Sequence, residues 1–443
     1  MRCRSLLVLF LLAACHGNDP ARPSGGSGSP PTMPKPVAGS SAVAPKPPDP
    51  PPQPPTEAKA PPPAPADEPP PPGHDFTPTA KELLVVGACG EGTPPDGVPA
   101  PILEKHCAVI KAAQDDYQQK WVKPARAFFA EKVPANLPKK VVYPFAGADL
   151  STALTVFPDA DEITTMSLEP VGDPRTLAAL TAPQPVAKGA KPGAEPKPDP
   201  RLERALAQIE KELKFLYRVN FSNTLNMIDA MRGGQLPTEL IFDLSALKIH
   251  GYEIVSLRYF TIQPDGTLHY LDDDEVAKAP DPGSAMAEKR NRVFANAELR
   301  FKKPGGRVQT YRHIQVNLDN EHQKADPRVL KHLEAKGTVA AMTKAASYLL
   351  SYESFSMIRD YLLEHTPWMV SDATGIAPRW GKPKGFEYET YGSFVAPHLP
   401  SGNGVAKNWR DEWEAQPKRD LAFRFGYYDK RISNHLVIMR KKP

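Results

Sequence analysis

The chain has 443 residues, of which 40% are hydrophobic and 24% are charged. Its 55 Lys and Arg against 51 Asp and Glu give a formal charge of +4, a balance that does not favour nucleic-acid binding. Proline is frequent, with 53 residues, so part of the chain is expected to stay outside a compact core.

The first residues have the order of an export signal. Arg2 and Arg4 precede an apolar run from Leu6 to Leu12. Charge followed by a short apolar stretch is typical of a secretory signal peptide. The run is too short to cross a bilayer, which takes about 20 apolar residues. Residues 1–14 are therefore predicted to be a signal peptide that is removed on export.

The sequence Leu12-Ala13-Ala14-Cys15 resembles the lipobox of bacterial lipoproteins. The resemblance implies that Cys15 receives a diacylglycerol, that the chain is cut before it, and that the new amino terminus is acylated. Several acyl chains would anchor the protein to the membrane, whereas one binds only reversibly. Because His16 rather than Asp follows the cysteine, the resemblance implies an outer-membrane location, with the domain facing the periplasm or the cell surface. A signal peptide with a coincidental cysteine is the alternative.

Residues 15–78 are expected to form a disordered tether. Residues 16–78 hold 23 of the 53 prolines and almost no large apolar side chain. Such a segment cannot bury enough surface to offset the entropy of ordering. Proline-rich stretches favour extended polyproline II, at about 3.1 Å per residue, and would carry a domain away from the lipid. Ligands for proline-binding modules are the alternative interpretation.

Cys89 and Cys107 are the cysteines of the predicted globular part, residues 79–443, once Cys3 leaves with the signal and Cys15 carries lipid. An even pair in an oxidising compartment predicts a disulfide. Closing this loop would stabilise the fold by about 3 kcal/mol. Two free thiols are an alternative, and a metal site would need more ligands than His106.

Residues 101–133 have apolar side chains at helical spacing, with a kink or break expected at Pro124. A strand at 140–145, a helix at 150–157 and a strand at 163–168 follow. This order, with a glycine in the first turn and an acid after the second strand, is typical of nucleotide-binding α/β folds.

The candidate ligand-binding residues of this unit are Phe145, Gly147 and Asp149 in the turn and Glu169 after the second strand. A dinucleotide fingerprint would have three glycines where this turn has Gly147 alone. We therefore interpret the segment as a structural β-α-β unit, in which Asp149 would cap the helix.

Residues 140–169 also resemble the first half of a class I S-adenosylmethionine methyltransferase. The resemblance places Phe145–Asp149 at the glycine-rich loop and Glu169 at the ribose-binding acid. The turn departs from the family's multi-glycine pattern, and the cofactor is made in the cytosol, where an exported domain would not meet it. We therefore expect no cofactor, and a scaffold whose cofactor role has been lost or replaced.

The middle of the chain alternates helices and hairpins. Residues 182–200 are of low complexity and predict an exposed loop. Helices are expected at 201–217 and 221–231, while 236–247 fits either a helix or a buried strand. Hairpin strands are expected at 252–262 with 268–271 and at 299–301 with 308–318.

The histidines of this region give no metal site. His313 lies on the strand face opposite Ile314 and could be a ligand or a base, although a structural histidine is the commoner case. His322 and His332 do not have helical metal-ligand spacing.

The C-terminal third predicts a crossover and more strands. A helix over 338–364 leads into a strand at 368–372, as in a parallel crossover. Asp372 would then stand at the carboxyl end of a strand, the usual place for ligand contact. A turn-stabilising Asp before Thr374-Gly375 is the alternative.

The last 60 residues of the sequence indicate antiparallel strands at 386–395, 421–428 and 435–439, with a helix at 409–413. The alternating aromatic residues Phe423, Phe425 and Tyr427 would lie on one face, where they line a cleft or seal a core.

We therefore expect an α/β domain with a mixed sheet, a Rossmann-like opening and antiparallel C-terminal strands. The chain has no nucleophile elbow, Walker loop or His-Glu-x-x-His motif, so no catalytic residue is assigned and no metal is expected. The soluble part as a whole resembles bacterial lipoproteins of uncharacterised function.

Two hypotheses follow. The first is a non-catalytic binding or structural domain at the outer membrane, with an envelope protein, a glycan or a small molecule as its partner. The second is an enzyme or a degenerate nucleotide- or S-adenosylmethionine-binding domain, and it requires Phe145–Asp149, Glu169 and Asp372 to converge in one pocket.

Overall fold

The computed structural model describes residues 69–182, 199–219, 236–282, 287–344, 346–394, 399–400, 402, 404–426 and 434–442. The chain divides into two compact units, residues 1–64 and 65–443, and the described residues all belong to the second. The predicted signal peptide, Cys15, residues 15–68 of the predicted tether, the predicted helix at 221–231, Tyr427 and nearly all of the 182–200 loop lie outside the described residues.

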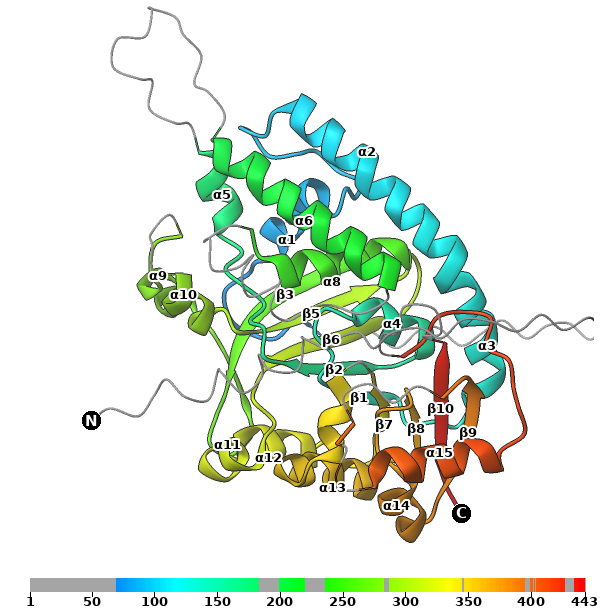
Figure 1. Cartoon of the computed structure of the whole chain (residues 1–443). Helices are drawn as coiled ribbons and strands as arrows, with labels where there is room; N and C mark the ends of the chain where they lie inside the picture. The colour runs from blue at the N-terminus through cyan, green and yellow to red at the C-terminus, as the bar shows by residue number, and fades with distance from the viewer. Residues whose placement is uncertain are drawn as a thin grey trace, which may run out of the picture. The chain divides into compact units, whose positions relative to one another are not determined.

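The second unit is an α/β domain built on a ten-stranded mixed sheet with the order β4-β3-β5-β6-β2-β1-β7-β8-β10-β9 (Figure 1). The five central strands β6-β2-β1-β7-β8 are parallel, and antiparallel strands extend the sheet on both sides. The mixed α/β class expected from the sequence is therefore correct. The strands are β1 Lys140–Pro144, β2 Glu162–Ser167, β3 Glu253–Ile262, β4 Leu268–Tyr270, β5 Asn296–Lys302, β6 Val308–Gln315, β7 Ala340–Thr343, β8 Trp368–Ser371, β9 Phe386–Gly392 and β10 His435–Lys441.

Helices cover both faces of the sheet (Figure 1). One face carries α1 Thr77–Val86, α2 Ala100–Tyr117, α3 Lys123–Lys132, α4 Leu150–Val156, α5 Thr176–Thr181, α6 Pro200–Val219 and α8 Thr238–Ile249. The other carries α11 Asn320–Ala325, α12 Arg328–Glu334, α13 Ser356–His365, α14 Pro378–Gly381 and α15 Val405–Ala415. The short helices α9 Asp273–Lys278 and α10 Ala287–Val293 lie near the β3–β4 hairpin.

The alternation of side chains along β1 explains the two cores. Val141 and Tyr143 belong to the apolar cluster under α4 and α8, whereas Val142 belongs to the cluster under α13. A parallel strand covered on both faces is apolar at nearly every position. Helix α4 joins β1 to β2, and Val142 is in register with Thr164 across the parallel pair. The nucleotide-binding character of this opening stays a prediction.

The break expected near Pro124 is a π-helical turn, Gln118–Val122, between α2 and α3. Cys89 and Cys107 form the disulfide that the sequence predicts, with their Cα atoms 5.3 Å apart. The bridge ties the middle of α2 to the segment after α1, so Cys89 and Cys107 are neither free thiols nor metal ligands. The ambiguous segment at 236–247 is helical, as α8.

The prediction of a continuous helix over 338–364 is wrong in its first part. Residues Ala340–Thr343 form strand β7, which pairs in parallel with β1 and β8. Two 3-10 turns, Ala346–Ser351 and Glu353–Phe355, then lead into α13. The alanines favour a helix by local propensity. However, the four residues of β7 are buried on both faces, and small side chains fit between two helix layers.

Two more boundaries differ from the sequence predictions. Residues 421–426 form a loop rather than a strand, joined to the sheet by an isolated bridge between Phe425 and Asn434. Phe423 and Phe425 are buried and seal the core under α3. The folded part also begins before residue 79, because Phe76 is buried between Tyr259 and Phe294.

Candidate functional site

The candidate residues meet at the carboxyl edge of the parallel strands. Counted along the chain, the five parallel strands have the spatial order 3-2-1-4-5, because β6, β2, β1, β7 and β8 are neighbours. The connection from β1 to β2 passes through α4 on one face, and that from β7 to β8 passes through α13 on the other. In open α/β sheets, ligands bind at the carboxyl ends of the strands where the connections diverge in this way.

A charged residue follows each of four neighbouring parallel strands. Glu169 comes after β2, Asp149 after β1, Lys344 after β7 and Asp372 after β8. The sequence singled out the three acids. It gave no signal for Lys344, which lies in the segment expected to be helical.

The turn after β1 is conformationally unusual. Phe145 has a φ of +60° and Gly147 a φ of +52°. A positive φ is uncommon for a bulky residue and costs free energy, which the surrounding packing must offset. The Phe145 ring packs against Phe355 with ring centroids 5.7 Å apart, and the Ala146 N–H donates to the carbonyl of Met166 in β2 at 3.0 Å.

Asp149 forms a buried ion pair with Lys344. The Lys344 Nζ lies 2.7 Å from Asp149 Oδ2, and the side chains are 0% and 3% exposed. Tyr143 donates its hydroxyl to the same oxygen at 2.8 Å, and Thr152 donates to Oδ1 at 2.5 Å. Asp149 precedes α4 without accepting a side-chain capping bond from the helix backbone, so the capping role considered for it is wrong.

The environment of Lys344 is both apolar and acidic. Burial lowers the pKa of the Lys344 ammonium, while Asp149 and then Asp372 oppose that shift. Aromatic rings add to the surroundings, since Nζ lies 5.9 Å from the ring centroid of Trp121 and 5.6 Å from that of Phe425. Lys344 therefore supplies positive charge to the two acids at the ends of β1 and β8.

Asp372 stabilises the turn that follows β8. Its Oδ1 accepts hydrogen bonds from Ser347 Oγ at 2.9 Å, Thr374 N at 2.9 Å and Thr374 Oγ1 at 2.5 Å. The residue is fully buried. The alternative interpretation of Asp372, a turn-stabilising carboxylate, therefore describes its contacts.

A second buried cluster lies beside Glu169. His313 of β6 donates from Nε2 to the Glu169 carbonyl at 2.8 Å, and its Nδ1 lies 3.3 Å from Glu239 Oε1 of α8. Burial opposes charge on the imidazole, but Glu239, Asp243 and the Glu169 carbonyl together raise the pKa of His313 to about 9. Burial raises the pKa of Glu239, and burial together with Glu239 raises that of Asp243, one helical turn along α8.

Several buried carboxylate oxygens lack a hydrogen-bond partner. In the described part of the chain these are Oε2 of Glu239, Oδ1 of Asp243 and Oε1 of Glu169, whereas Glu239 Oε1 has the ion pair with His313 Nδ1. Glu239 and Asp243 were not singled out in the sequence, where α8 showed no amphipathic period. His313 makes hydrogen bonds inside the fold, which is the commoner, structural case expected for a strand histidine. Its face of β6 is buried rather than exposed.

The acids converge on one edge of the sheet, where their side chains are buried. Lys344 interacts with Asp149 and Asp372, and Glu239 interacts with Glu169 and Asp149. Asp149, Glu169 and Asp372 are nevertheless 2%, 1% and 0% exposed. Within the described residues, no group of three or more His, Cys, Asp or Glu has the arrangement of a metal site.

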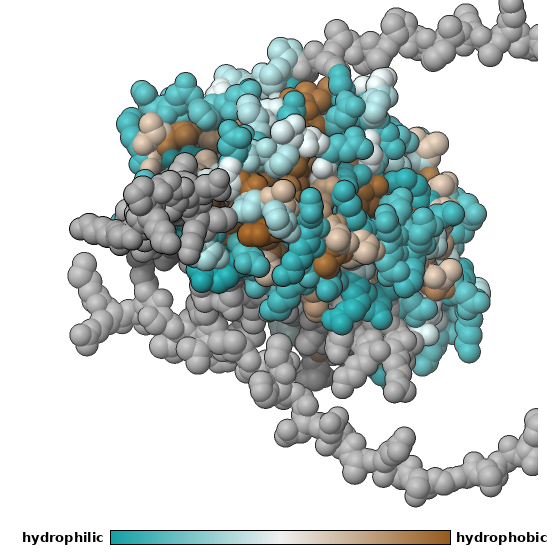
Figure 2. All heavy atoms as spheres, turned by 90° about the horizontal axis from the view of Figure 1, so that it is seen from above, coloured by the Kyte–Doolittle hydropathy of each residue, from teal (hydrophilic) through white to brown (hydrophobic). Residues whose placement is uncertain are grey.

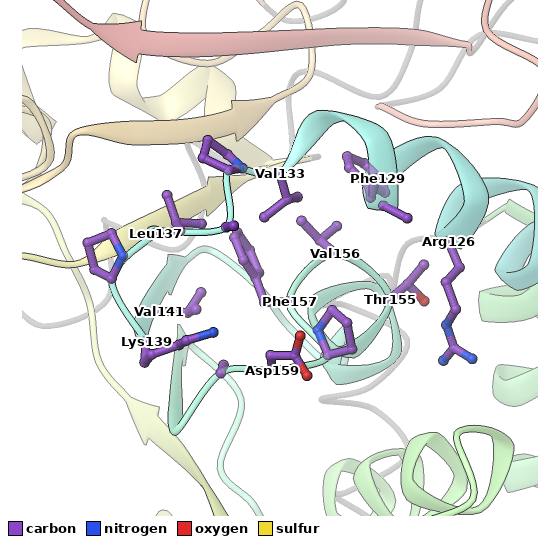
Figure 3. A pocket seen from close by; sticks show the side chains of 16 residues that line it. Arg126, Phe129, Val133, Leu137, Lys139, Val141, Thr155, Val156, Phe157 and Asp159 are labelled. Atoms are coloured by element: carbon purple, nitrogen blue, oxygen red, sulfur yellow. The ribbon is translucent and has the colours of Figure 1, made fainter. Parts of the chain in front are cut away.

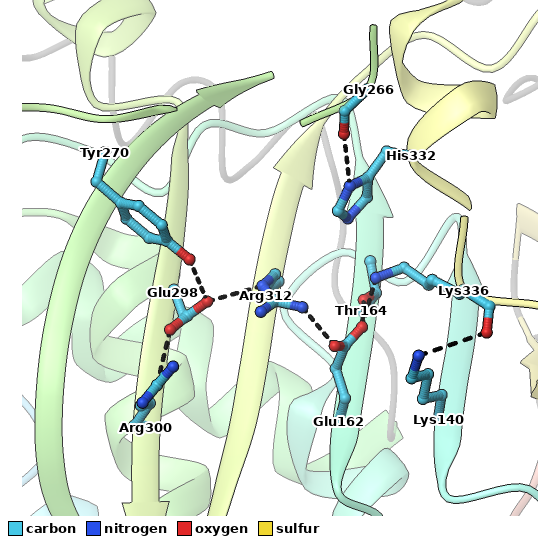
Figure 4. A network of polar contacts seen from close by, with 10 residues as sticks. All are labelled: Lys140, Glu162, Thr164, Gly266, Tyr270, Glu298, Arg300, Arg312, His332 and Lys336. Atoms are coloured by element: carbon cyan, nitrogen blue, oxygen red, sulfur yellow. Dashed lines mark hydrogen bonds and ion pairs between the residues drawn. The ribbon is translucent and has the colours of Figure 1, made fainter. Parts of the chain in front are cut away.

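A separate polar network crosses the opposite face of the sheet (Figure 4). Arg312 of β6 pairs with Glu298 of β5 at 2.8 Å and with Glu162 of β2, which also pairs with Lys336. Tyr270 donates to Glu298 at 2.6 Å. Despite burial, Lys336 and Arg312 lower the pKa of Glu162 to about 2. These charges are matched across the three neighbouring strands β5, β6 and β2, which indicates a structural role.

No family model, curated protein or solved structure matches the chain. Among the helices of the described residues, none combines the length and the apolar character needed to cross a membrane.

Proposed function

We propose that this protein is a lipid-anchored lipoprotein of the outer membrane whose α/β domain has a non-catalytic binding or structural role. The observation that carries the second half of this proposal is the buried Asp149–Lys344 pair. An open α/β sheet normally receives its ligand at this position. Here the domain places its own lysine against its own acid, and the neighbouring acids are closed to solvent.

The anchoring half of the proposal rests on the lipobox-like sequence before Cys15. The surface of the domain is compatible with it. The face that carries α2 and α6 is mainly hydrophilic, with separate apolar spots between charged residues (Figure 2). Ion pairs such as Lys105–Glu203 and Lys214–Glu210 lie on these helices. The described residues of this face form no broad apolar area for a bilayer, so attachment would depend on the acyl chains at Cys15.

The partner of the domain would be another envelope component. An envelope protein, a glycan or a small molecule fits the proposed location, and the nearly balanced charge does not favour a nucleic acid.

A second candidate function is a ligand site at the carboxyl edge, and the unpartnered carboxylates favour it. Five buried acids, Asp149, Glu169, Glu239, Asp243 and Asp372, lie there with Lys344 and His313 as the basic groups. A ligand with N–H donors or a positive charge, such as the amino group of S-adenosylmethionine, would supply the missing hydrogen bonds. Such a ligand could enter only if the edge opened.

Membrane partition of matched cysteine variants tests the anchor. Cys15→Ser should lose acylation, visible by mass spectrometry of the amino-terminal peptide, and should change its processing and its partition into membranes. Cys3→Ser is the control, because that residue leaves with the predicted signal peptide, and it should behave like the parent. Equal processing and partition of Cys15→Ser and the parent would refute the anchor.

Thermal unfolding with added ligands separates the two candidate functions. Under the main proposal, nucleotides and S-adenosylmethionine leave the Tm unchanged, whereas a sugar or peptidoglycan fragment can raise it. If S-adenosylmethionine raises the Tm of the parent and Glu239→Gln weakens that effect, the second candidate replaces the first.

A further inference from the structure

A pocket of about 360 Å³ lies between α3, the loop after it and the end of α4 (Figure 3). Its interior is lined by apolar side chains from two stretches of chain, residues 126–141 and 155–160. These are Phe129, Val133, Leu137, Val141, Val156 and Phe157. A pocket of this size with mostly apolar walls and a few polar groups is typical of a small-molecule site.

The pocket is distinct from the carboxyl-edge site. Val141 lies at the amino-terminal end of β1, whereas Asp149 follows the carboxyl end of the same strand. None of Phe145, Gly147, Asp149 or Lys344 lines the pocket.

Charged groups stand at the margin of the pocket. Arg126, Lys139 and Asp159 are among its lining residues, and Figure 3 shows Lys139 and Asp159 on one side and Arg126 on the other. Lys139 and Asp159 are exposed, and Arg126 is half-buried. The charged lining therefore has a net charge of +1, which favours an anionic ligand.

Arg126 has hydrogen-bonding capacity that the described residues do not use. One terminal nitrogen donates to His250 Nδ1 at 2.6 Å. Burial, and then the charge of Arg126, lower the pKa of His250 to about 3, so the imidazole accepts this bond in its neutral form. No carboxylate of the described residues pairs with Arg126, and its buried Nε–H has no acceptor there.

An anionic oxygen in the pocket would give Arg126 the counter-charge that the described residues do not supply. Hydrogen bonds between a guanidinium and a carboxylate are charge-assisted and stronger than neutral ones. A half-buried arginine without a counter-charge, beside an apolar pocket, is arranged to hold the head of a molecule whose body is apolar.

We propose that this pocket binds an amphiphilic carboxylate, with its apolar chain between Phe129, Val156 and Phe157 and its carboxylate at Arg126. Lys139 adds positive charge at the other side of the opening. The inference goes beyond the proposed function and does not depend on the lipid anchor or on the carboxyl-edge site.

Saturation-transfer NMR with octanoate tests the proposal on the full-length chain in one detergent. All samples contain the same micelles, so differences between variants report the pocket. Ala130→Trp fills the pocket from an exposed lining position, and Ala127→Trp is its control on an exposed position of the same helix outside the lining. Unfolding midpoints of both variants verify that they fold.

We expect Ala130→Trp to weaken octanoate binding at least about tenfold, a difference that titration resolves easily, and Ala127→Trp to leave it unchanged. Arg126→Gln should weaken octanoate but not octanol, whereas Lys123→Gln, on the same helix and outside the lining, should affect neither. Equal octanoate binding by the two tryptophan variants would overturn the site. If the parent protein binds octylamine as tightly as octanoate, the role of Arg126 is overturned.

Discussion

The buried Asp149–Lys344 pair makes a quantitative prediction about stability. Lys344→Met removes the ammonium but keeps a long side chain among Trp121 and Phe425. The Asp149 carboxylate then stays buried with only hydroxyl donors, from Tyr143 and Thr152. Removing one partner of a buried pair typically costs about 3–5 kcal/mol, because the other charge is left uncompensated. We expect a loss of that size in the free energy of unfolding.

A double-mutant cycle separates the pair from the packing. Asp149→Asn together with Lys344→Met removes both charges, so it should recover at least half of the loss caused by Lys344→Met alone. The exposed pair Lys407–Asp411, with side chains 77% and 54% exposed, is the control. Lys407→Met should cost less than about 0.5 kcal/mol.

The assay is unfolding in guanidinium chloride of the full-length chain, followed by tryptophan fluorescence, to which Trp121 beside Lys344 contributes. The reasoning is refuted if Lys344→Met costs less than about 1 kcal/mol. It is equally refuted if the losses of the two single variants simply add in the double variant, since the charges would then not be coupled.

Two further predictions concern the sheet and the first turn. The pKa of Glu162 is lowered to about 2 from its ordinary value near 4.5, so its contribution of about 3 kcal/mol should be complete above pH 4.5 and disappear as the pH falls towards 2. Acid titration of the unfolding free energy should show this loss in the parent and a flatter profile in Glu162→Gln, and identical profiles would contradict it. At Phe145, where φ is +60°, the Gly variant should be more stable than the Ala variant by about 1 kcal/mol, because only Ala keeps the steric strain. Phe355, where φ is −121°, is the control position, and there the Ala variant should have a higher denaturant midpoint than the Gly variant. If the Ala variant is the more stable one at both positions, strain at Phe145 is ruled out.

Local patterns in the sequence were sufficient for much of the fold. The apolar strand, turn and helix from residue 140 onwards predicted β1, α4 and β2, because a buried β-α-β unit is encoded within a short stretch of chain. The charged and apolar alternation of α6 and the turn residues of the β3–β4 and β5–β6 hairpins are also local signals. The Cys89–Cys107 bridge followed from cysteine count and expected compartment.

Other features depend on contacts that no local pattern contains. Strand β7 is a strand because β1 and β8 lie on both sides of it, although its alanines favour a helix. Without β7, Lys344 could not be placed at the sheet edge.

The sequence by itself determined which acids follow the strands β1, β2 and β8, because each comes within a few residues of a strand-like run. The tertiary structure alone decided what those acids do. Lys344 lies 195 residues from Asp149 in sequence, and Glu239 and His313 come from different elements. Burying an unpaired charge is costly. Whether a carboxylate is paired inside the protein or left available to a ligand therefore depends on which side chain from another part of the sequence lies beside it.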